Sequence, residues 1–370
     1  MPTAGRIDDR RAAMAIQNGT IDPDKLNAFM GKMLNDVGAA MNASLLLIGD
    51  KLGLYKALAE AGPMTSQELA EKTETSERYI REWLAAQAAS DYVAYDPGTG
   101  RFSMQPEQAA VFADEDSPVF LGAVGDLVAA TLRDEPAISD AFRTGSGVGW
   151  DKRDKCLFCG TARFFRTAYR HHLVQEWLPA LEGVVEKLEQ GASVADIGCG
   201  HGVSTMIMAR AFPNSRFHGF DYHPGSIEDA RSAAEAAGMA ERVTFEVSTA
   251  KTVPARGYDL VCFFDCLHDM GDPVGALRHV RTTMAPEGTC MLVEPFANDR
   301  LEDNFNPVGR VYYAASTVIC TPASLDQEVG LALGAQAGEA RLRKVAAEAG
   351  FTRFRRATET PFNLILEARP

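Results

Sequence analysis

The chain has 370 residues, 46% of them hydrophobic and 24% charged, which is the composition of a globular protein rather than a disordered or fibrous one. Its 50 acidic residues outnumber 37 basic ones and give a formal charge of -13, which argues against a nucleic-acid partner, because binding phosphates requires clustered Lys and Arg. The start is polar and no run of about 20 residues is apolar, so neither a signal peptide nor a membrane partner is expected.

Residues 1–20 are predicted to form a flexible arm. From Asp24 onward, apolar residues recur at the spacing of one helix face, which predicts a long amphipathic helix. The residues of this stripe are Leu26, Phe29, Met30, Met33, Leu34, Val37, Met41, Leu45 and Ile48. So long a stripe needs a surface that covers it, and both the core of the same chain and a dimer interface satisfy that need.

A winged-helix domain is predicted over residues 21–115. Thr65 followed by Glu68 forms a capping box at the start of one helix, and Ser76 stands where it can cap the next. Residues 92–104 then alternate apolar and polar side chains around a Pro-Gly turn, as in a β-hairpin. The order of helix, short turn, helix and hairpin is that of a winged helix.

The second of these helices carries little excess positive charge. Arg78 and Arg81 are offset by Glu77 and Glu82, and the hairpin offers Arg101 alone. Reading bases and gripping phosphates both require a surplus of donors and positive charge. We therefore interpret the domain as structural, and DNA binding stays as the weaker alternative.

Residues 116–190 are predicted to be a helical connector and lid, with residues 145–149 as a flexible hinge. Cys156 and Cys159 have the spacing of a zinc knuckle, but no second pair follows, so no metal site is predicted and the role of the two thiols is left open. The chain's seven cysteines are unevenly spaced, which indicates reduced thiols and a cytoplasmic location. One aromatic cluster is compatible with the core or with a pocket wall: Phe158, Phe164, Phe165 and Tyr169.

From residue 191 to 370 short apolar runs alternate with helical stretches, which predicts an α/β domain with a parallel sheet covered on both faces. Expected strands are residues 194–198, 216–221, 243–247, 258–264, 290–294, 352–358 and 362–368. Expected helices are residues 203–212, 225–238, 274–285 and 341–350. The last two strands are close enough in sequence to form a hairpin.

The first of these strands ends in a glycine-rich loop. Gly198, Gly200 and Gly202 occupy its first, third and fifth positions, whereas a dinucleotide fingerprint requires glycine at the sixth, where Val203 stands. A NAD-dependent dehydrogenase is therefore disfavoured. Asp221 ends the second strand, where a carboxylate can accept hydrogen bonds from both hydroxyls of a ribose.

The motif Val194-Ala-Asp-Ile-Gly-Cys-Gly-His-Gly202, together with Phe217-His-Gly-Phe-Asp221, resembles the first two motifs of class I S-adenosylmethionine (SAM) dependent methyltransferases. With its winged-helix front end, the chain is similar to small-molecule O-methyltransferases. The resemblance implies a Rossmann-like doubly wound sheet with an antiparallel last strand, SAM as cofactor and a homodimer formed through the N-terminal helices. Predicted cofactor contacts are Asp196, Gly198, Gly200, Gly202, Asp221, Tyr222, Thr249, Ala250, Phe264 and Asp265. For Asp196, organising the amides of the loop and binding the cofactor directly both remain open.

Two further residues resemble the catalytic pair of plant-type O-methyltransferases. His268 corresponds to their general base, and Glu294, at the end of the fifth strand, to a carboxylate that orients the imidazole. An imidazole can remove the proton of a phenol or alcohol near neutral pH, which makes the oxygen a better nucleophile. A histidine in this place can equally line the cofactor site without acting as a base, and that alternative stays open.

Two functions from different classes follow. The first is a SAM-dependent methyltransferase that acts on a small, aromatic or apolar acceptor, with O-methylation favoured and residues 304–338 helping to wall the acceptor pocket. The second is a SAM-binding regulator without catalysis, whose winged helix grips DNA. The acidic balance of the chain disfavours the second function.

Overall fold

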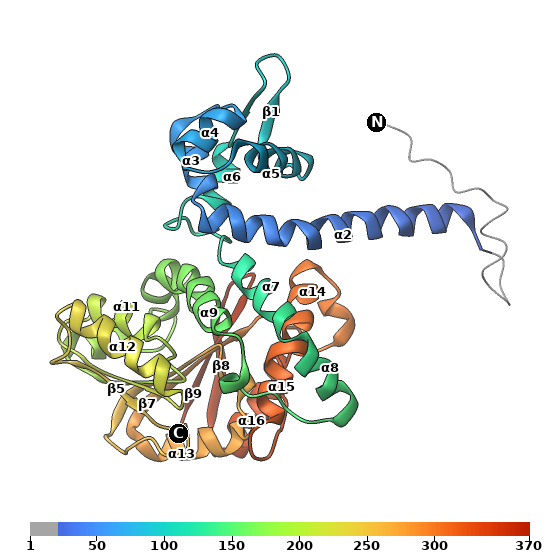
Figure 1. The fold of residues 1–370 in the computed structure, drawn as a ribbon. Coiled ribbons are helices and arrows are strands. Elements are labelled where there is room, and N and C mark those ends of the chain that lie inside the picture. Colours follow the sequence, from blue (N-terminus) through green and yellow to red (C-terminus); the bar gives the residue numbers. More distant parts are fainter. Residues whose placement is uncertain (1–20) are drawn as a thin grey trace. The chain divides into compact units, whose positions relative to one another are not determined.

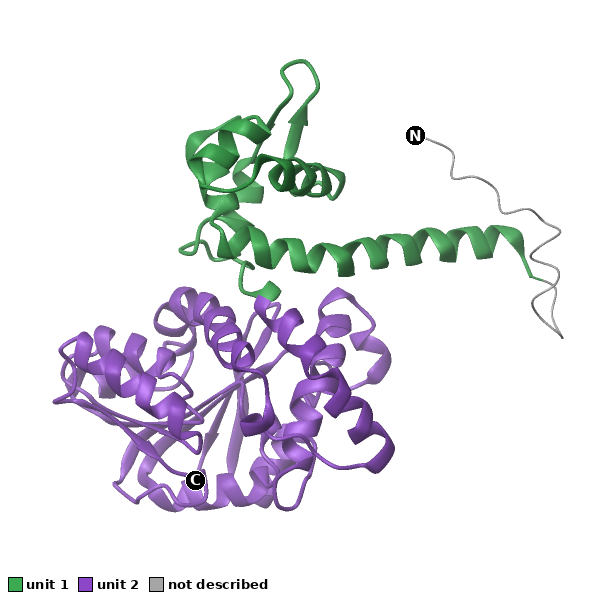
Figure 2. Ribbon diagram, in the orientation of Figure 1, with its two compact units in different colours: residues 1–125 green, residues 126–370 purple. Residues whose placement is uncertain are grey.

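The structure, a computed structural model, describes residues 21–370, so the predicted arm at residues 1–20 lies outside the described residues. The chain divides into two compact units, residues 1–125 and residues 126–370 (Figure 2). The division falls inside the segment 116–190 that the sequence assigned to a connector. Most of this segment therefore belongs to the second unit.

The first unit begins with the predicted long helix, α2 (Pro23–Lys51). Asp22 caps its first turn by accepting hydrogen bonds from the amides of Asp24 and Lys25, and Pro23 at the first helical position has the φ that a helix needs. Near its other end, Asn42 is 4% exposed and accepts a 2.7 Å hydrogen bond from Gln87, which in turn accepts one from the Tyr55 hydroxyl. This buried polar network joins three helices of the unit.

The winged helix is confirmed by the elements that follow α2 (Figure 1). They are α3 (Leu54–Ala61), α4 (Ser66–Lys72), α5 (Glu77–Ala89), β1 (Ala94–Asp96), β2 (Arg101–Ser103) and α6 (Pro106–Phe112). The capping box of Thr65 and Glu68 is present. Ser76 occupies the cap position of α5, but its side chain makes no capping hydrogen bond, so that part of the expectation was wrong. The hairpin pairs Tyr95 with Phe102.

The second unit contains the predicted sheet, a seven-stranded one in the order β5-β4-β3-β6-β7-β9-β8. Its strands are β3 (Ser193–Ile197), β4 (Arg216–Asp221), β5 (Val243–Val247), β6 (Tyr258–Phe264), β7 (Met284–Pro295), β8 (Arg353–Glu359) and β9 (Asn363–Arg369). Strands β3 to β7 pair in parallel, and β9 runs antiparallel to both of its neighbours, β7 and β8. The α/β fold with a reversed last strand is therefore confirmed.

Helices cover both faces of this sheet (Figure 1). Those that follow strands are α11 (Val203–Ala211), α12 (Pro224–Ala236), α13 (Pro273–Thr283) and α16 (Gly338–Glu348). Those before the sheet are α7 (Val124–Arg133), α8 (Glu135–Thr144), η1 (Trp150–Lys152), α9 (Lys155–Ala168), η2 (Tyr169–Trp177) and α10 (Val184–Gln190). The short helix η3 (Leu267–Asp269) lies between β6 and α13. Between β7 and α16 lie η4 (Leu301–Asn304), α14 (Pro307–Ala315), η5 (Ser316–Cys320) and α15 (Thr321–Leu325).

Part of the connector belongs to the core of the second unit rather than to a layer outside it. Leu173 and Trp177 of η2 are fully buried in the same cluster as Val194 of β3 and Leu260 of β6.

Strand β7 begins at Met284, six residues before the expected strand, because the backbone there already pairs with β6.

Among the described residues, no single helix is long and apolar enough to cross a membrane; one pair, α2 with α3, bent by 66°, meets the length and composition criteria jointly.

Candidate functional site

The glycine loop after β3 adopts a backbone that requires glycine. Gly198, Gly200 and Gly202 all have positive φ angles, of 70°, 51° and 74°. A Cβ on Gly198 would lie 2.8 Å from the Cys266 sulfur, and one on Gly202 would lie 2.5 Å from the Phe245 ring. The loop can therefore turn tightly beneath a ligand only with this sequence.

Asp221, at the end of β4, accepts backbone hydrogen bonds through both of its oxygens, and one of these bonds holds the glycine loop. Oδ2 accepts a 3.0 Å hydrogen bond from the Gly200 amide, and Oδ1 accepts a 2.8 Å bond from the His223 amide. Burial raises the pKa of this carboxyl, and the two amides oppose the rise. Each carboxylate oxygen keeps a free lone pair, so Asp221 can also accept two ligand hydroxyls.

Asp196 is fully buried and lies behind the loop. Its Oδ2 accepts hydrogen bonds from the hydroxyls of Ser204, at 2.7 Å, and Thr205, at 2.6 Å, both on α11. Burial raises the pKa of Asp196 to about 6. The residue thus anchors the first turn of the helix after the loop, and its hydrogen bonds go to hydroxyls rather than to the loop amides that the sequence suggested.

A cavity of about 660 Å³ opens above the ends of β3, β4 and β6. Eight of the ten predicted cofactor contacts line it: Gly198, Gly200, Asp221, Tyr222, Thr249, Ala250, Phe264 and Asp265. Asp196 and Gly202 do not line it, because the first is buried under α11 and the second faces Phe245. The loop and the two flanking strands are therefore brought together as predicted.

The aromatic cluster of α9 and η2 contributes one wall of the cavity. Phe158, Phe165 and Tyr169 line it, whereas Phe164 does not. The Phe158 ring stacks on His223, with ring centroids 4.5 Å apart. The pocket interpretation therefore holds for three of the four residues, and His201 and His223 also lie in the cavity wall.

Several wall residues were not foreseen from the sequence. Trp150 follows the glycine-rich stretch 145–149 directly, which was the available signal. Lys251 lines the cavity and pairs with Asp272, at 3.0 Å, and with Glu328. Glu328 comes from the 304–338 segment, whereas Phe305 of that segment is 73% exposed and lies away from the wall.

His268 and Glu294 form a buried pair. His268 Nδ1 lies 2.6 Å from Glu294 Oε2, while Oε1 accepts a 3.1 Å bond from the Leu267 amide. The two residues are 3% and 1% exposed, and neither lines the cavity; the adjacent Asp269 does. Burial opposes the charging of His268, but the nearby carboxylates Glu294 and Asp269 outweigh it and raise its pKa above the usual range.

Asp265 carries a second buried carboxyl beside this pair. Its Oδ2 accepts a 3.1 Å bond from the Tyr169 hydroxyl and its Oδ1 a 2.8 Å bond from the Asn363 amide. Burial first, and then the charge of Glu294, raise the pKa of Asp265 to about 8. The backbone here has φ of 50°, which is uncommon for a residue other than glycine.

The Cys156–Cys159 pair lies in the first turns of α9. Cys156 is half-buried and Cys159 exposed, and all seven cysteines of the chain lie in the described part and are free thiols. Within residues 21–370, the one group of side chains with the spacing of metal ligands is His268, Asp269 and Cys320, so the pair belongs to none.

The cavity fits an adenosyl amino acid. Gly198 and Gly200 line it without side chains, Asp221 retains acceptors for a sugar, and aromatic rings form part of its wall. The lining carboxyls outnumber its single lysine, which is tied to two of them, so a ligand with positive charge is favoured.

Comparison with known proteins agrees with this geometry. Residues 188–350 match the family described as "Methyltransferase domain", and residues 40–113 match the "Rv2258c-like winged HTH domain". Trans-aconitate 2-methyltransferase of Escherichia coli O1:K1 / APEC is 27% identical over 128 residues, 34% of this chain and 49% of that protein. The enzyme of the same name from Streptomyces avermitilis is 29% identical over 125 residues, 34% of this chain and 46% of its own length. The chain thus spans about half the length of the curated relatives it matches.

Solved structures share the whole fold. Human N-acetylserotonin methyltransferase in complex with SAM superposes with a TM-score of 0.69 at 18% identity, covering 95% of this chain and 99% of that one. Mitomycin 7-O-methyltransferase gives 0.66 at 21% identity, over 94% and 100% of the two chains.

The fold and the site together define a class I methyltransferase domain joined to an N-terminal winged helix. Residues 188–350 of the chain therefore form a methyltransferase domain.

Proposed function

We propose that the protein transfers the methyl group of SAM to an oxygen atom of a small, aromatic or apolar acceptor, with His268 as general base. The observation that carries this proposal is the buried pair of His268 and Glu294. His268 is adjacent in sequence to Asp269, which lines the cavity. The buried pair supports a proton acceptor beside a site whose other predicted residues would bind the cofactor.

The residues that would hold the cofactor are those of the glycine loop and Asp221. SAM supplies a methyl group on a sulfonium, which needs no protonation to leave. The protein's own tasks are then to position the acceptor and remove its proton, since methyl transfer requires an in-line approach of about 3–3.5 Å.

Glu294 prepares His268 for that task. A carboxylate only accepts hydrogen bonds, so Nδ1 donates to Glu294. Nε2 takes the acceptor's proton when the imidazole is neutral, which requires a pH above the raised pKa of His268. The same carboxylate stabilises the imidazolium that forms. Because Glu294 is fixed by the Leu267 amide, it orients the ring and acts as a positioning residue.

The charge of the cavity narrows the acceptor class. Lys251 is the single Lys or Arg among the described residues that line it, and two carboxylates already pair with it. An acceptor with several carboxylates, such as the one in the name of the curated relatives, would lack cationic partners here. The aromatic wall of Trp150, Phe158 and Phe165 instead suits a neutral, flat acceptor.

The test is a product assay with purified protein. We expect S-adenosylhomocysteine to form from SAM with phenols or other neutral hydroxyl compounds, and the methylated oxygen to be identified by mass spectrometry and NMR. trans-Aconitate serves as the matched anionic acceptor. Turnover with trans-aconitate but with no neutral compound would contradict the proposed acceptor class.

A homodimer through α2 is the second part of the proposal. Phe29, Leu34, Val37 and Met41 on one stripe of this helix are between 53% and 71% exposed, which favours a covered state. A cytoplasmic location is proposed on the seven free thiols.

The alternative, a DNA-binding regulator, is supported by the match of residues 40–113 to a winged helix-turn-helix domain. On α5, however, Arg78 pairs with Glu82 and Arg81 with Glu77, which removes positive charge from the helix that would enter the groove. A salt-dependent mobility shift with generic duplex DNA would favour the regulator; absence of a shift at low salt would exclude it.

A further inference from the structure

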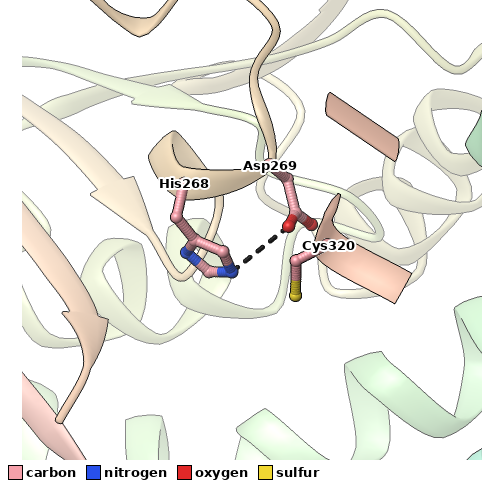
Figure 3. Close-up of side chains that lie close together, drawn as sticks. All are labelled: His268, Asp269 and Cys320. Atoms are coloured by element: carbon pink, nitrogen blue, oxygen red, sulfur yellow. Dashed lines mark ion pairs between the residues drawn. The ribbon is translucent and has the colours of Figure 1, made fainter. Parts of the chain in front are cut away.

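Three side chains with metal-ligating atoms converge beside the cavity (Figure 3). His268 and Asp269 come from η3, and Cys320 is the last residue of η5. One ligand atom of each lies within 4.8 Å of the other two. His268 and Cys320 are buried, and the Asp269 side chain is 13% exposed and reaches the cavity wall.

His268 and Asp269 lie close together but form no hydrogen bond with each other. Nδ1 donates to Glu294, so Nε2 turns toward Asp269 Oδ1 at 3.2 Å (Figure 3). Asp269 Oδ1 is nevertheless buried without a hydrogen-bond partner among the described residues, since the geometry is not that of a hydrogen bond. Buried polar atoms are nearly always satisfied, so this oxygen has room for a further partner such as a cation.

The donor set identifies the class of cation. An imidazole nitrogen, a carboxylate oxygen and a thiolate are the ligands that Zn²⁺ and similar transition metals prefer, whereas Mg²⁺ and Ca²⁺ take oxygen ligands. Ligand bonds of about 2.0–2.3 Å place the donor atoms of a tetrahedral site roughly 3–4 Å apart. The spacing of His268 Nε2 from Asp269 Oδ1 falls in that range.

Glu294 completes the arrangement. Metal-bound histidines usually donate their other ring nitrogen to a carboxylate, which fixes the tautomer and orients the ring. Glu294 has this relation to His268, and its other oxygen is anchored by the Leu267 amide.

We propose that His268 Nε2, a carboxylate oxygen of Asp269 and the Cys320 thiolate bind one divalent transition-metal ion of the zinc type, leaving a fourth position for water. The thiol proton is released to solvent when the metal–sulfur bond forms, and so is a proton on Nε2 where one is present. Nε2 is also the atom that the base needs, so a bound metal inhibits methyl transfer. That inhibition rests on the proposed function, whereas the binding itself does not.

The binding experiment uses Co²⁺ alone as a spectroscopic probe for the full-length protein. We expect one Co²⁺ per chain, with a thiolate-to-metal charge-transfer band in the near ultraviolet, and displacement of Co²⁺ by Zn²⁺. Cys320→Ser should abolish the band. Asp269→Asn should keep the thiolate and weaken binding at least about tenfold, and Glu294→Gln should weaken it about 10–100-fold.

The matched control is the double variant Cys156→Ser/Cys159→Ser, which removes the two thiols with zinc-knuckle spacing in the sequence and should keep the band. Circular dichroism and SAM binding check that each variant is folded. No stoichiometric Co²⁺ in the wild type overturns the proposal. A band that survives in Cys320→Ser and disappears in the double variant overturns it as well.

Measuring turnover in the presence of Zn²⁺ separates the proposed metal site from the proposed function. Micromolar Zn²⁺ should suppress turnover of the wild type and of the double variant alike. Turnover that persists with one Zn²⁺ bound per chain overturns the inhibition while leaving the binding. A protein that binds Co²⁺ as described but methylates no acceptor supports the metal site and contradicts the proposed function.

Discussion

The two units differ in which unusual side chains they expose or bury: the first exposes apolar side chains, and the second buries charged ones. In the first unit, α2 leaves Phe29, Leu34 and Met41 58%, 65% and 71% exposed. In the second, charged groups are taken inside: Asp196 and Glu294 are at most 1% exposed. Figure 2 shows the two units in different colours.

Each departure costs free energy, and each indicates a different role. Apolar surface in water forgoes about 25 cal/mol per Å² that burial would return, so an exposed stripe is favourable only where a partner covers it. A buried carboxyl loses its hydration and is retained where its charge or proton is used. The exposed stripe thus supports the proposed dimer through α2, and the buried carboxyls support the proposed site in the second unit.

The largest expected effect concerns the surface of α2. Leu34→Glu/Met41→Glu places two charges in the middle of the stripe, and a two-fold dimer would contain each change twice. At about 1.5–3 kcal/mol for each buried side chain, the dimer should weaken by more than about 6 kcal/mol, over 10⁴-fold. Sedimentation velocity should show a wild-type dimer and a monomeric variant; Asn35→Glu, on the opposite side of the helix, is the control. A monomeric wild type would contradict the proposal.

The second effect concerns the base. His268→Ala should lower turnover about 10²–10⁴-fold, because the acceptor would have to lose its proton to water. SAM affinity, measured by calorimetry, should stay within about twofold of wild type, since His268 does not line the cavity. Glu294→Gln should change the pH profile of turnover as well as its rate. Near-normal turnover in His268→Ala would leave His268 as a structural residue only.

The third effect is a pH dependence of stability from Asp265, which faces Tyr169, His268, Glu294 and Asn363. Its pKa is raised to about 8 in the folded state, mainly by burial, against an ordinary value near 4 when unfolded. Below pH 4 both states are protonated and stability is unaffected. As the pH rises from 4 to 8 the unfolded chain ionises first, so stability falls, and above 8 the loss is complete.

The variant Asp265→Asn should remove this loss. Between pH 5 and 8 its advantage over the wild type should grow by an amount on the order of 4 kcal/mol, at 1.36 kcal/mol for each pKa unit. Thermal unfolding across this range measures it, with the exposed Glu235→Gln as control. A constant difference between variant and wild type would show that Asp265 is ionised throughout.

The smallest effect tests the cofactor side. Asp221→Asn removes the charge but keeps the size, and the loss of charge-assisted hydrogen bonds should weaken SAM binding by about 1.5–3 kcal/mol, roughly 10–150-fold. Titration calorimetry measures the affinity, and Glu241→Gln, an exposed acid before β5, is the control. Unchanged affinity in a folded variant would contradict the assignment of Asp221.

Much of the cofactor side was predictable because its signals are local in sequence. The glycines at 198, 200 and 202 directly follow a strand, and Asp221 ends the next strand, so parallel pairing alone brings them to one edge. Asp196 shows the limit of such reasoning. The motif identifies Asp196, but only the folded structure shows that it accepts hydrogen bonds from Ser204 and Thr205 of α11.

Local patterning by itself determined the winged helix and the succession of strands and helices along the chain. The reversed last strand was implied by the family resemblance. Periodicity, caps and turn glycines act within a few residues, so they can be recognised in the amino-acid sequence alone. The tertiary structure alone decided that Asn363 meets Asp265, that Cys320 meets His268, and that the stripe of α2 stays uncovered within its own unit. These outcomes depend on burial and on contacts between segments far apart in the chain, which packing creates and no local pattern encodes.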